Sequence, residues 1–95
     1  MANIGTFVFT NMGFQKVSTL AEITFDENNL YEIQNQGGDI MLRAGTEGTG
    51  EILGYKDVRN YETAGSDDLY IAPLYPNSGR EIKINISARA KRAFD

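Results

Sequence analysis

Residues 80–88 read Arg-Glu-Ile-Lys-Ile-Asn-Ile-Ser-Ala, and this stretch decides the class of fold. Ile82, Ile84 and Ile86 alternate with polar residues, and Ala88 continues their row. Successive side chains of a β-strand point to opposite faces of its sheet, so the alternation predicts a strand with one buried face and one hydrated face. Much of the chain repeats this pattern less regularly, which indicates an all-β protein.

Further stretches favour strands and follow one another at intervals of about ten residues. They cover residues 4–10, 14–20, 21–25, 30–36, 39–44, 51–58 and 69–72. Tyr31 and Ile33 are expected to face inward, and Gly37-Gly38 predicts a tight hairpin turn after them. No segment has a convincing helical period. We therefore expect an antiparallel β-sandwich of about seven short strands, either jelly-roll or immunoglobulin-like.

The composition of the 95-residue chain suits one globular domain and offers little for catalysis. Hydrophobic residues make up 41% and charged residues 23%, which argues against wholesale disorder. The sequence has no cysteine and no histidine, so disulfides and thiolate chemistry are excluded, and the commonest general base and transition-metal ligand is missing. We expect no catalytic residue, no cofactor, no bound metal and no enzyme. Residues 1–88 are expected to form the domain and residues 89–95 a basic, flexible tail.

The charge and the apolar runs argue against two kinds of partner. The net charge is −4, whereas binding of nucleic acid phosphates needs a basic surface. No apolar run approaches the length of about 20 residues that a membrane helix needs, and the first residues lack the basic and apolar regions of a secretory signal. We therefore expect neither nucleic acid nor a membrane as a partner.

Two kinds of turn sequence could hold a ligand, although solvated turns are the plainer interpretation. The glycine-rich loop at residues 45–50 lacks the Lys and the Ser or Thr of a phosphate-binding loop, and no helix is expected after it. It better suits a loop that contacts a partner. Residues 26–29 and Asp67-Asp68 could offer oxygen ligands to calcium, but neither has the spacing of a known calcium loop. Binding of a calcium ion or a glycan is left open.

Aromatic and basic side chains are the best candidates for contacts with partners. Tyrosine is common at protein interfaces, and exposed aromatic rings also stack on sugars. The N-terminal strand could add to the edge of a neighbour's sheet, and the basic tail could dock on an acidic surface with Phe94 as an anchor. The possible interface residues are Phe7, Phe9, Tyr55, Tyr61, Tyr75, Arg89, Lys91, Arg92 and Phe94.

Three blocks of sequence carry a resemblance to a known group of proteins. They are Phe14-Gln15-Lys16-Val17-Ser18, Tyr31-Glu32-Ile33-Gln34-Asn35-Gln36-Gly37 and Gly65-Ser66-Asp67-Asp68-Leu69-Tyr70-Ile71. In this order and spacing, the chain over residues 14–88 resembles small β-rich virion structural proteins of tailed bacteriophages. The resemblance implies a β-sandwich that forms a homo-oligomer, often a trimer, and binds major capsid or other virion proteins. It also implies a virion protein that is made in the host cytoplasm without a signal peptide.

Two functions are compatible with this resemblance. The first is a capsid decoration or stabilising protein that binds across the joints between capsid subunits. The second is a fibre module, or a receptor- or carbohydrate-binding module, of a phage head or tail. A shared open face for Tyr55, Tyr61 and Tyr75 would favour the second function. An enzyme would depend on carboxylates or tyrosine alone and is not expected.

Overall fold

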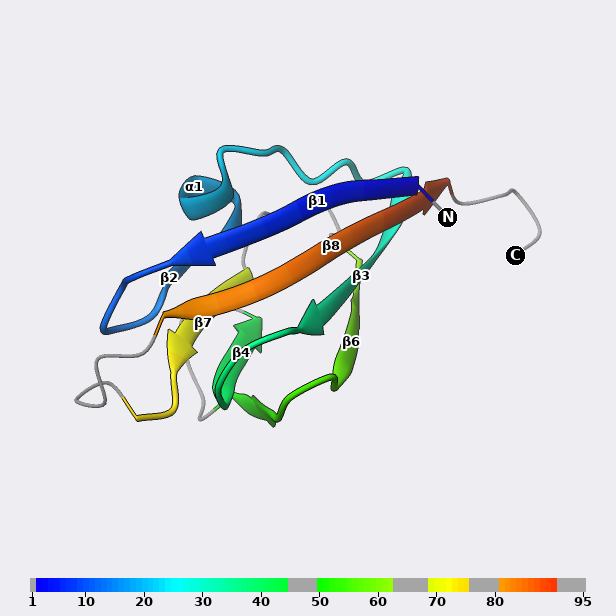
Figure 1. Cartoon of the computed structure of the whole chain (residues 1–95). Coiled ribbons are helices and arrows are strands. Elements are labelled where there is room, and N and C mark those ends of the chain that lie inside the picture. The colour runs from blue at the N-terminus through cyan, green and yellow to red at the C-terminus, as the bar shows by residue number, and fades with distance from the viewer. Residues whose placement is uncertain (1, 45–49, 63–68, 76–80, 91–95) are drawn as a thin grey trace.

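The structure of the chain, a computed structural model, describes residues 2–44, 50–62, 69–75 and 81–90. These residues form eight strands and one short helix (Figure 1). In chain order they are β1 (Ala2–Phe9), β2 (Gln15–Lys16), α1 (Val17–Ala21), β3 (Asn29–Asn35), β4 (Ile40–Ala44), β5 (Glu51–Leu53), β6 (Val58–Tyr61), β7 (Leu69–Pro73) and β8 (Ile82–Ala90). The expectation of an all-β protein is confirmed.

The strands form two four-stranded antiparallel sheets that pack face to face as a sandwich. One sheet has the order β1-β8-β3-β6, and the other has the order β2-β7-β4-β5. The first strand thus pairs with the eighth, the second with the seventh, the third with the sixth and the fourth with the fifth. This is the winding of a two-stranded ribbon that is doubled over and rolled up, the jelly roll. It differs from the immunoglobulin-like alternative, in which the first, second, fifth and fourth strands form one sheet.

β8 is the strand that the alternation predicted, and it lies inside its sheet between β1 and β3. Ile82, Ile84 and Ile86 are at most 2% exposed. Full burial of one isoleucine side chain contributes about 1.5–3 kcal/mol, so this strand supplies a large part of the core. β8 ends at Ala90, which places Arg89 in the sheet and shortens the expected tail.

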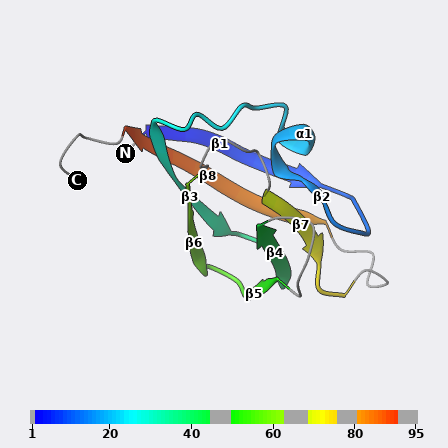
Figure 2. The ribbon, with the colours of Figure 1, turned by 180° about the vertical axis from the view of Figure 1, so that it is seen from behind.

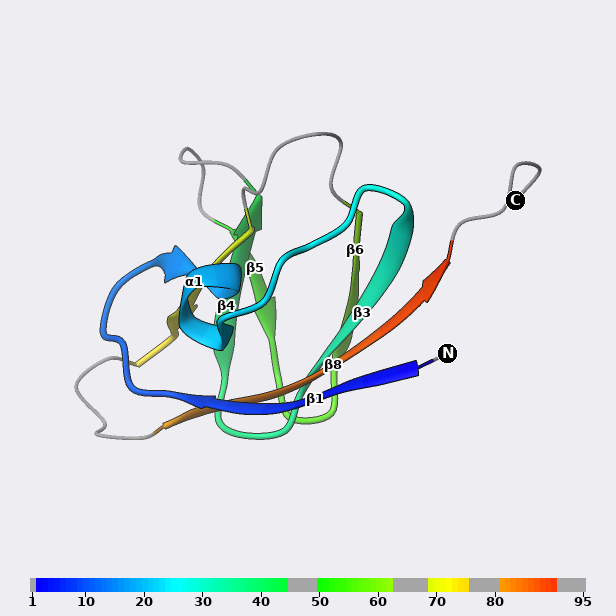
Figure 3. The same cartoon turned by 90° about the horizontal axis from the view of Figure 1, so that it is seen from above.

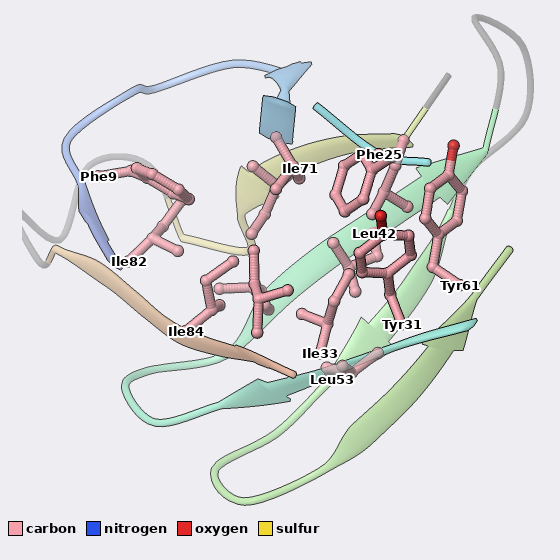
Figure 4. Packing of buried hydrophobic residues seen from close by; sticks show 14 residues of the cluster. Phe9, Phe25, Tyr31, Ile33, Leu42, Leu53, Tyr61, Ile71, Ile82 and Ile84 are labelled. Atoms are coloured by element: carbon pink, nitrogen blue, oxygen red, sulfur yellow. The ribbon is translucent and has the colours of Figure 1, made fainter. Parts of the chain in front are cut away.

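The core lies between the two sheets and draws side chains from both (Figure 4). Tyr31 and Ile33 of β3 are buried, which confirms their expected inward orientation. Ile40 and Leu42 of β4 are also buried and belong to the same cluster from the second sheet. The period of two along each strand therefore places every second side chain between the sheets.

The helix α1 replaces most of the strand expected at residues 14–20, and a turn with irregular chain replaces the one expected at 21–25. Only the short β2 remains of them, and α1 follows it directly. Val17, Leu20 and Ala21 contact the core. Their spacing of three and four residues puts them on one face of a helix, whereas a strand would divide them between two faces. The strand predictions for this region were therefore wrong.

The segment after α1 places Phe25 beside two tyrosines in the core. Its ring contacts those of Tyr31 and Tyr61 edge to face, with centroid distances of 4.8 Å and 5.0 Å. Figure 4 shows the three rings together. The main-chain N–H of Asp26 donates to the hydroxyl oxygen of Tyr31 at 2.6 Å, so the buried ring keeps a polar partner.

The chain changes sheet at two connections that the sequence pattern did not reveal. Gly37-Gly38 does not form a hairpin, because β3 and β4 belong to different sheets. The strand expected at residues 51–58 is likewise two strands, β5 and β6, in different sheets (Figure 2). In the turn between them, the N–H of Asp57 donates to the carbonyl oxygen of Gly54 at 3.0 Å.

Asn35, the last residue of β3, forms hydrogen bonds to both the β3–β4 connection and the β5–β6 turn. Its side chain is 0% exposed, and its Nδ2 donates to the carbonyl oxygens of Gly38 at 2.9 Å and Leu53 at 3.0 Å. Its Oδ1 accepts from the N–H of Gly37 at 2.9 Å, and its own N–H donates to the carbonyl oxygen of Asp57 at 2.9 Å. Because burial of an amide without hydrogen bonds is costly, the two connections depend on each other through this residue.

Replacement of Asn35 by alanine should therefore destabilise the fold strongly. We expect Asn35→Ala to lower the free energy of unfolding by about 3 kcal/mol, because buried hydrogen bonds contribute about 1 kcal/mol each and unpaired buried groups add a further cost. Urea denaturation followed by circular dichroism measures the change. The control is Gln34→Ala, one residue earlier on the opposite face of β3, with an expected loss below about 0.5 kcal/mol. Equal losses in the two variants would contradict the role of Asn35.

Candidate functional site

A groove opens at the end of the sandwich where the chain crosses between the sheets, and we call it the crossover groove. Its volume is about 660 Å³. Its walls come from the β3–β4 connection, the β5–β6 turn, the end of β7 and the start of β8, which Figure 3 shows near one end of the molecule. The lining residues are Gln36, Gly37, Gly38, Asp39, Ile40, Tyr55, Pro73, Tyr75, Glu81 and Ile82.

Main-chain hydrogen bonds hold the walls of the crossover groove together. The N–H of Gln36 donates to the carbonyl oxygen of Lys83 in β8 at 2.8 Å. The N–H of Leu74, just after β7, donates to the carbonyl oxygen of Asp39 at 3.1 Å. Ile40 and Ile82, which line the groove, are buried and belong to the core beneath it. The groove is therefore built into the sandwich and shares its rigidity.

The lining of the crossover groove is acidic and aromatic. Asp39 and Glu81 bring exposed carboxylates, and Tyr55 and Tyr75 bring exposed rings. None of the described residues that line it is basic. At its margin, the Nζ of Lys56 lies 5.5 Å from the centroid of the Tyr55 ring. Carboxylates accept hydrogen bonds and attract cations, and aromatic rings stack or bind cations on their faces, so this lining suits binding.

The structure separates the three tyrosines that the sequence analysis grouped. Tyr55 and Tyr75 are 61% and 65% exposed, and both line the crossover groove. Tyr61 is 5% exposed and packs against Phe25, so it does not share an open face with the other two. Phe9 is also buried in the core, and neither it nor Tyr61 offers an exposed contact in the single chain.

Of the remaining predicted interface residues, the structure describes Phe7 and Arg89, and neither of them lines the groove. Phe7 is partly buried and packs against the core. Arg89 is exposed near the end of β8. Lys91, Arg92 and Phe94 lie outside the described residues. The structure therefore brings together Tyr55 and Tyr75 and places Arg89 near the other end of β8.

The structure describes only part of the positions considered for a nucleotide or a calcium ion. Of the glycine-rich loop only Gly50 is described, and Asp67-Asp68 lie outside the described residues. In residues 26–29, Oδ1 of Asp26 accepts from the N–H of Asn28 at 2.8 Å, the hydrogen bond of an ordinary turn. Within the described ranges, no three acidic, histidine or cysteine side chains gather where they could hold a metal ion. No helix in these ranges is long and apolar enough to cross a membrane.

β1 leaves one long side of its sheet open, and we call this side the β1 edge. Among the strands that the structure describes, β1 pairs with β8 alone. It has eight residues, whereas the other edge strands β2, β5 and β6 have two, three and four. β1 contains no charged residue, and Ile4 and Val8 are 41% and 53% exposed. Short length and charge are the usual protections of an edge against pairing, and the β1 edge lacks both.

A bulge divides the β1 edge into two parts. The register with β8 shifts between Asn3 and Gly5, and Gly5 has a φ of 154°, a conformation that favours glycine. From Gly5 to Phe9 the pairing with β8 is regular. The regular part of the edge that another strand could join is therefore residues 5–9.

The outer face of the second sheet carries contacts that the sequence analysis missed. The guanidinium carbon of Arg43 lies 4.0 Å from the ring centroid of Phe14 and 5.5 Å from that of Tyr70. Ile52 of β5 is 61% exposed and lies opposite Met41 of β4. These residues are far apart in the sequence, so no local pattern marks them. The acidic lining of the crossover groove escaped notice for the same reason.

Comparison with known proteins assigns the chain to no family. No family model, curated protein or solved structure matches it. A functional proposal therefore rests on the surfaces described above and on the phage-like blocks of the sequence.

The exposed and buried tyrosines should differ in their effect on stability. We expect Tyr61→Ala to lower the free energy of unfolding by about 3–4 kcal/mol, because it leaves a cavity beside Phe25. Tyr55→Ala and Tyr75→Ala remove exposed rings and should each change it by less than about 0.5 kcal/mol. Urea denaturation of the three variants measures the difference. A large loss for Tyr55→Ala would show that this ring supports the fold and is not available for binding.

Proposed function

We propose that this chain is a structural protein of a phage virion, and specifically a capsid decoration or stabilising protein that binds across the joints between capsid subunits. The observation that supports this most is the β1 edge, which is long, uncharged and open. The proposed partners are the major capsid protein or other virion proteins, and further copies of this chain.

An open strand edge binds another chain through main-chain groups. The unpaired N–H and C=O groups of β1 can extend the sheet with a strand of a neighbouring subunit. The exposed side chain of Val8 would then be partly covered, and each Å² of apolar surface removed from water contributes about 25 cal/mol. Contacts of this kind can be individually weak, because a capsid repeats its subunit joints many times and two linked contacts bind more tightly than one.

The fold supports the proposal by analogy alone. Jelly rolls occur in viral capsid proteins and also in lectins, and one fold serves many functions. The proposal therefore depends on the phage-like sequence blocks and on the β1 edge.

The crossover groove favours a second candidate, a carbohydrate- or receptor-binding module of a phage fibre. Exposed aromatic rings beside carboxylate and amide groups are suited to sugars, which offer apolar faces and hydroxyl groups. Tyr55 and Tyr75 meet this description. Because Tyr61 is in the core, the platform expected from three tyrosines is reduced to two.

A lysine on the β1 edge should weaken binding to capsid shells. We expect Val8→Lys to reduce co-sedimentation with empty shells of the encoding phage by about tenfold in apparent affinity, equivalent to about 1.4 kcal/mol, because a charged side chain opposes pairing at an edge. The matched control is Val58→Lys, the same substitution at a 45% exposed residue of β6, the opposite edge of the same sheet. It should bind like the wild-type protein.

Two outcomes would count against the proposal. If wild-type protein at micromolar concentration stays in the supernatant with shells present, the decoration function is wrong. If the shells bind the two lysine variants equally well, the β1 edge is not the contact surface. Urea denaturation of both variants shows whether each is folded under the conditions of the assay.

A further inference from the structure

β8 runs between two regions of opposite charge. It begins at the crossover groove, which Asp39 and Glu81 line, and it ends in the basic segment, residues 89–95. We propose that the crossover groove of one copy binds the basic segment of a second copy, so that copies of the chain associate head to tail. This contact goes beyond capsid binding and does not depend on it.

The crossover groove has the chemistry to bind a guanidinium or ammonium group. Its two carboxylates are exposed, and no basic residue among the described lining neutralises them. Aromatic rings attract cations to their faces. The ring of Tyr55 already has the Nζ of Lys56 at 5.5 Å from its centroid, and Tyr75 supplies a second exposed ring. A segment that carries both positive charge and an aromatic side chain would match this lining.

The basic segment has this composition. Three of the nine basic residues of a chain with net charge −4 lie in it, and Asp95 is its one acidic residue. Phe94 adds an aromatic ring, which can stack on the exposed rings of Tyr55 and Tyr75. The basic residues are Arg89, Lys91 and Arg92.

The distance that β8 spans favours a contact between two copies over a contact within one chain. β8 has nine residues, and at about 3.3 Å per residue it separates the groove from the basic segment by about 26 Å. Figure 3 shows the start and the end of β8 on opposite sides of the molecule. Residues 91–95 reach at most about 18 Å when fully extended, so the segment does not return to the groove of its own chain. Contacts between two unlike surfaces propagate into rings or open chains.

A neutral oligosaccharide is the main rival for the groove. It could stack on Tyr55 and Tyr75, but a neutral sugar brings no positive charge to Asp39 and Glu81. A basic segment uses the rings and the carboxylates together, and charge complementarity of this kind selects partners. The lining therefore favours the segment of a second copy.

Sedimentation velocity of the full chain tests the contact. Wild-type protein should associate in about 0.05 M NaCl and dissociate in about 0.5 M NaCl, where charges are screened over a few Å. A groove variant, Asp39→Lys with Glu81→Lys, should self-associate about tenfold more weakly. A segment variant, Lys91→Glu with Arg92→Glu, should show the same loss. An equal mixture of the two should associate again, because each groove then meets a segment of opposite charge.

The matched control is Glu22→Lys with Glu27→Lys, which makes the same change of charge at two exposed residues outside the groove. It should associate like the wild-type protein. Circular dichroism shows whether each variant is folded. The proposal is overturned if wild-type protein stays monomeric at low salt, or if the mixture of two folded variants fails to associate.

A peptide of residues 88–95 gives a second measurement that needs no folded variant. Added to isotope-labelled wild-type protein at low salt, it should shift the amide NMR signals of Gly37, Gly38 and Tyr55. The same peptide with Lys91→Glu and Arg92→Glu should leave them in place. If maltotriose shifts these signals and the basic peptide does not, the groove is a sugar site and the proposal is wrong.

Discussion

The buried amide of Asn35 is the constraint on which the rest of the structure depends. It lies where the chain leaves one sheet after β3, and its hydrogen bonds also reach the turn by which the chain returns from β5 to β6. An amide held away from water must find partners within the protein. Gly38 and Leu53 supply these partners only when both connections occupy their observed positions. These hydrogen bonds hold together the two connections that place β4 and β5 in the sheet opposite β3 and β6.

The same constraint positions the crossover groove. Asp39 lies on the first connection and Tyr55 on the second, so the relative placement of a carboxylate and a ring follows from the bonds of Asn35. Main-chain hydrogen bonds then attach the first connection to the start of β8 and to the residue just after β7. Binding groups held by packed elements keep their geometry without a partner, which lowers the entropic cost of binding.

The surfaces of the protein suit assembly with other chains. The β1 edge runs along one long side, whereas the crossover groove and the basic segment lie at opposite ends of β8. The two proposed contacts therefore use different regions and can form at the same time. A subunit with a lateral contact to a shell and an end-to-end contact to its own kind gains avidity from each additional neighbour. On a repeating surface such as a capsid, a protein with both proposed contacts would bind more tightly than one with either contact alone.

The sequence by itself determined which side chains of a strand are buried, because a period of two is a local property of extended backbone. The alternation at residues 82–88 was sufficient to predict β8, and the spacing of about ten residues between the strand-like stretches predicted the sandwich class. Only the tertiary structure decided which sheet each strand joins. Gly37-Gly38 has the sequence of a hairpin turn, and residues 51–58 have that of one strand, yet both cross between the sheets because Asn35 bonds across them. Sheet membership, the burial of Tyr61 and the meeting of Tyr55 with Tyr75 depend on contacts between distant residues, which a local pattern does not contain.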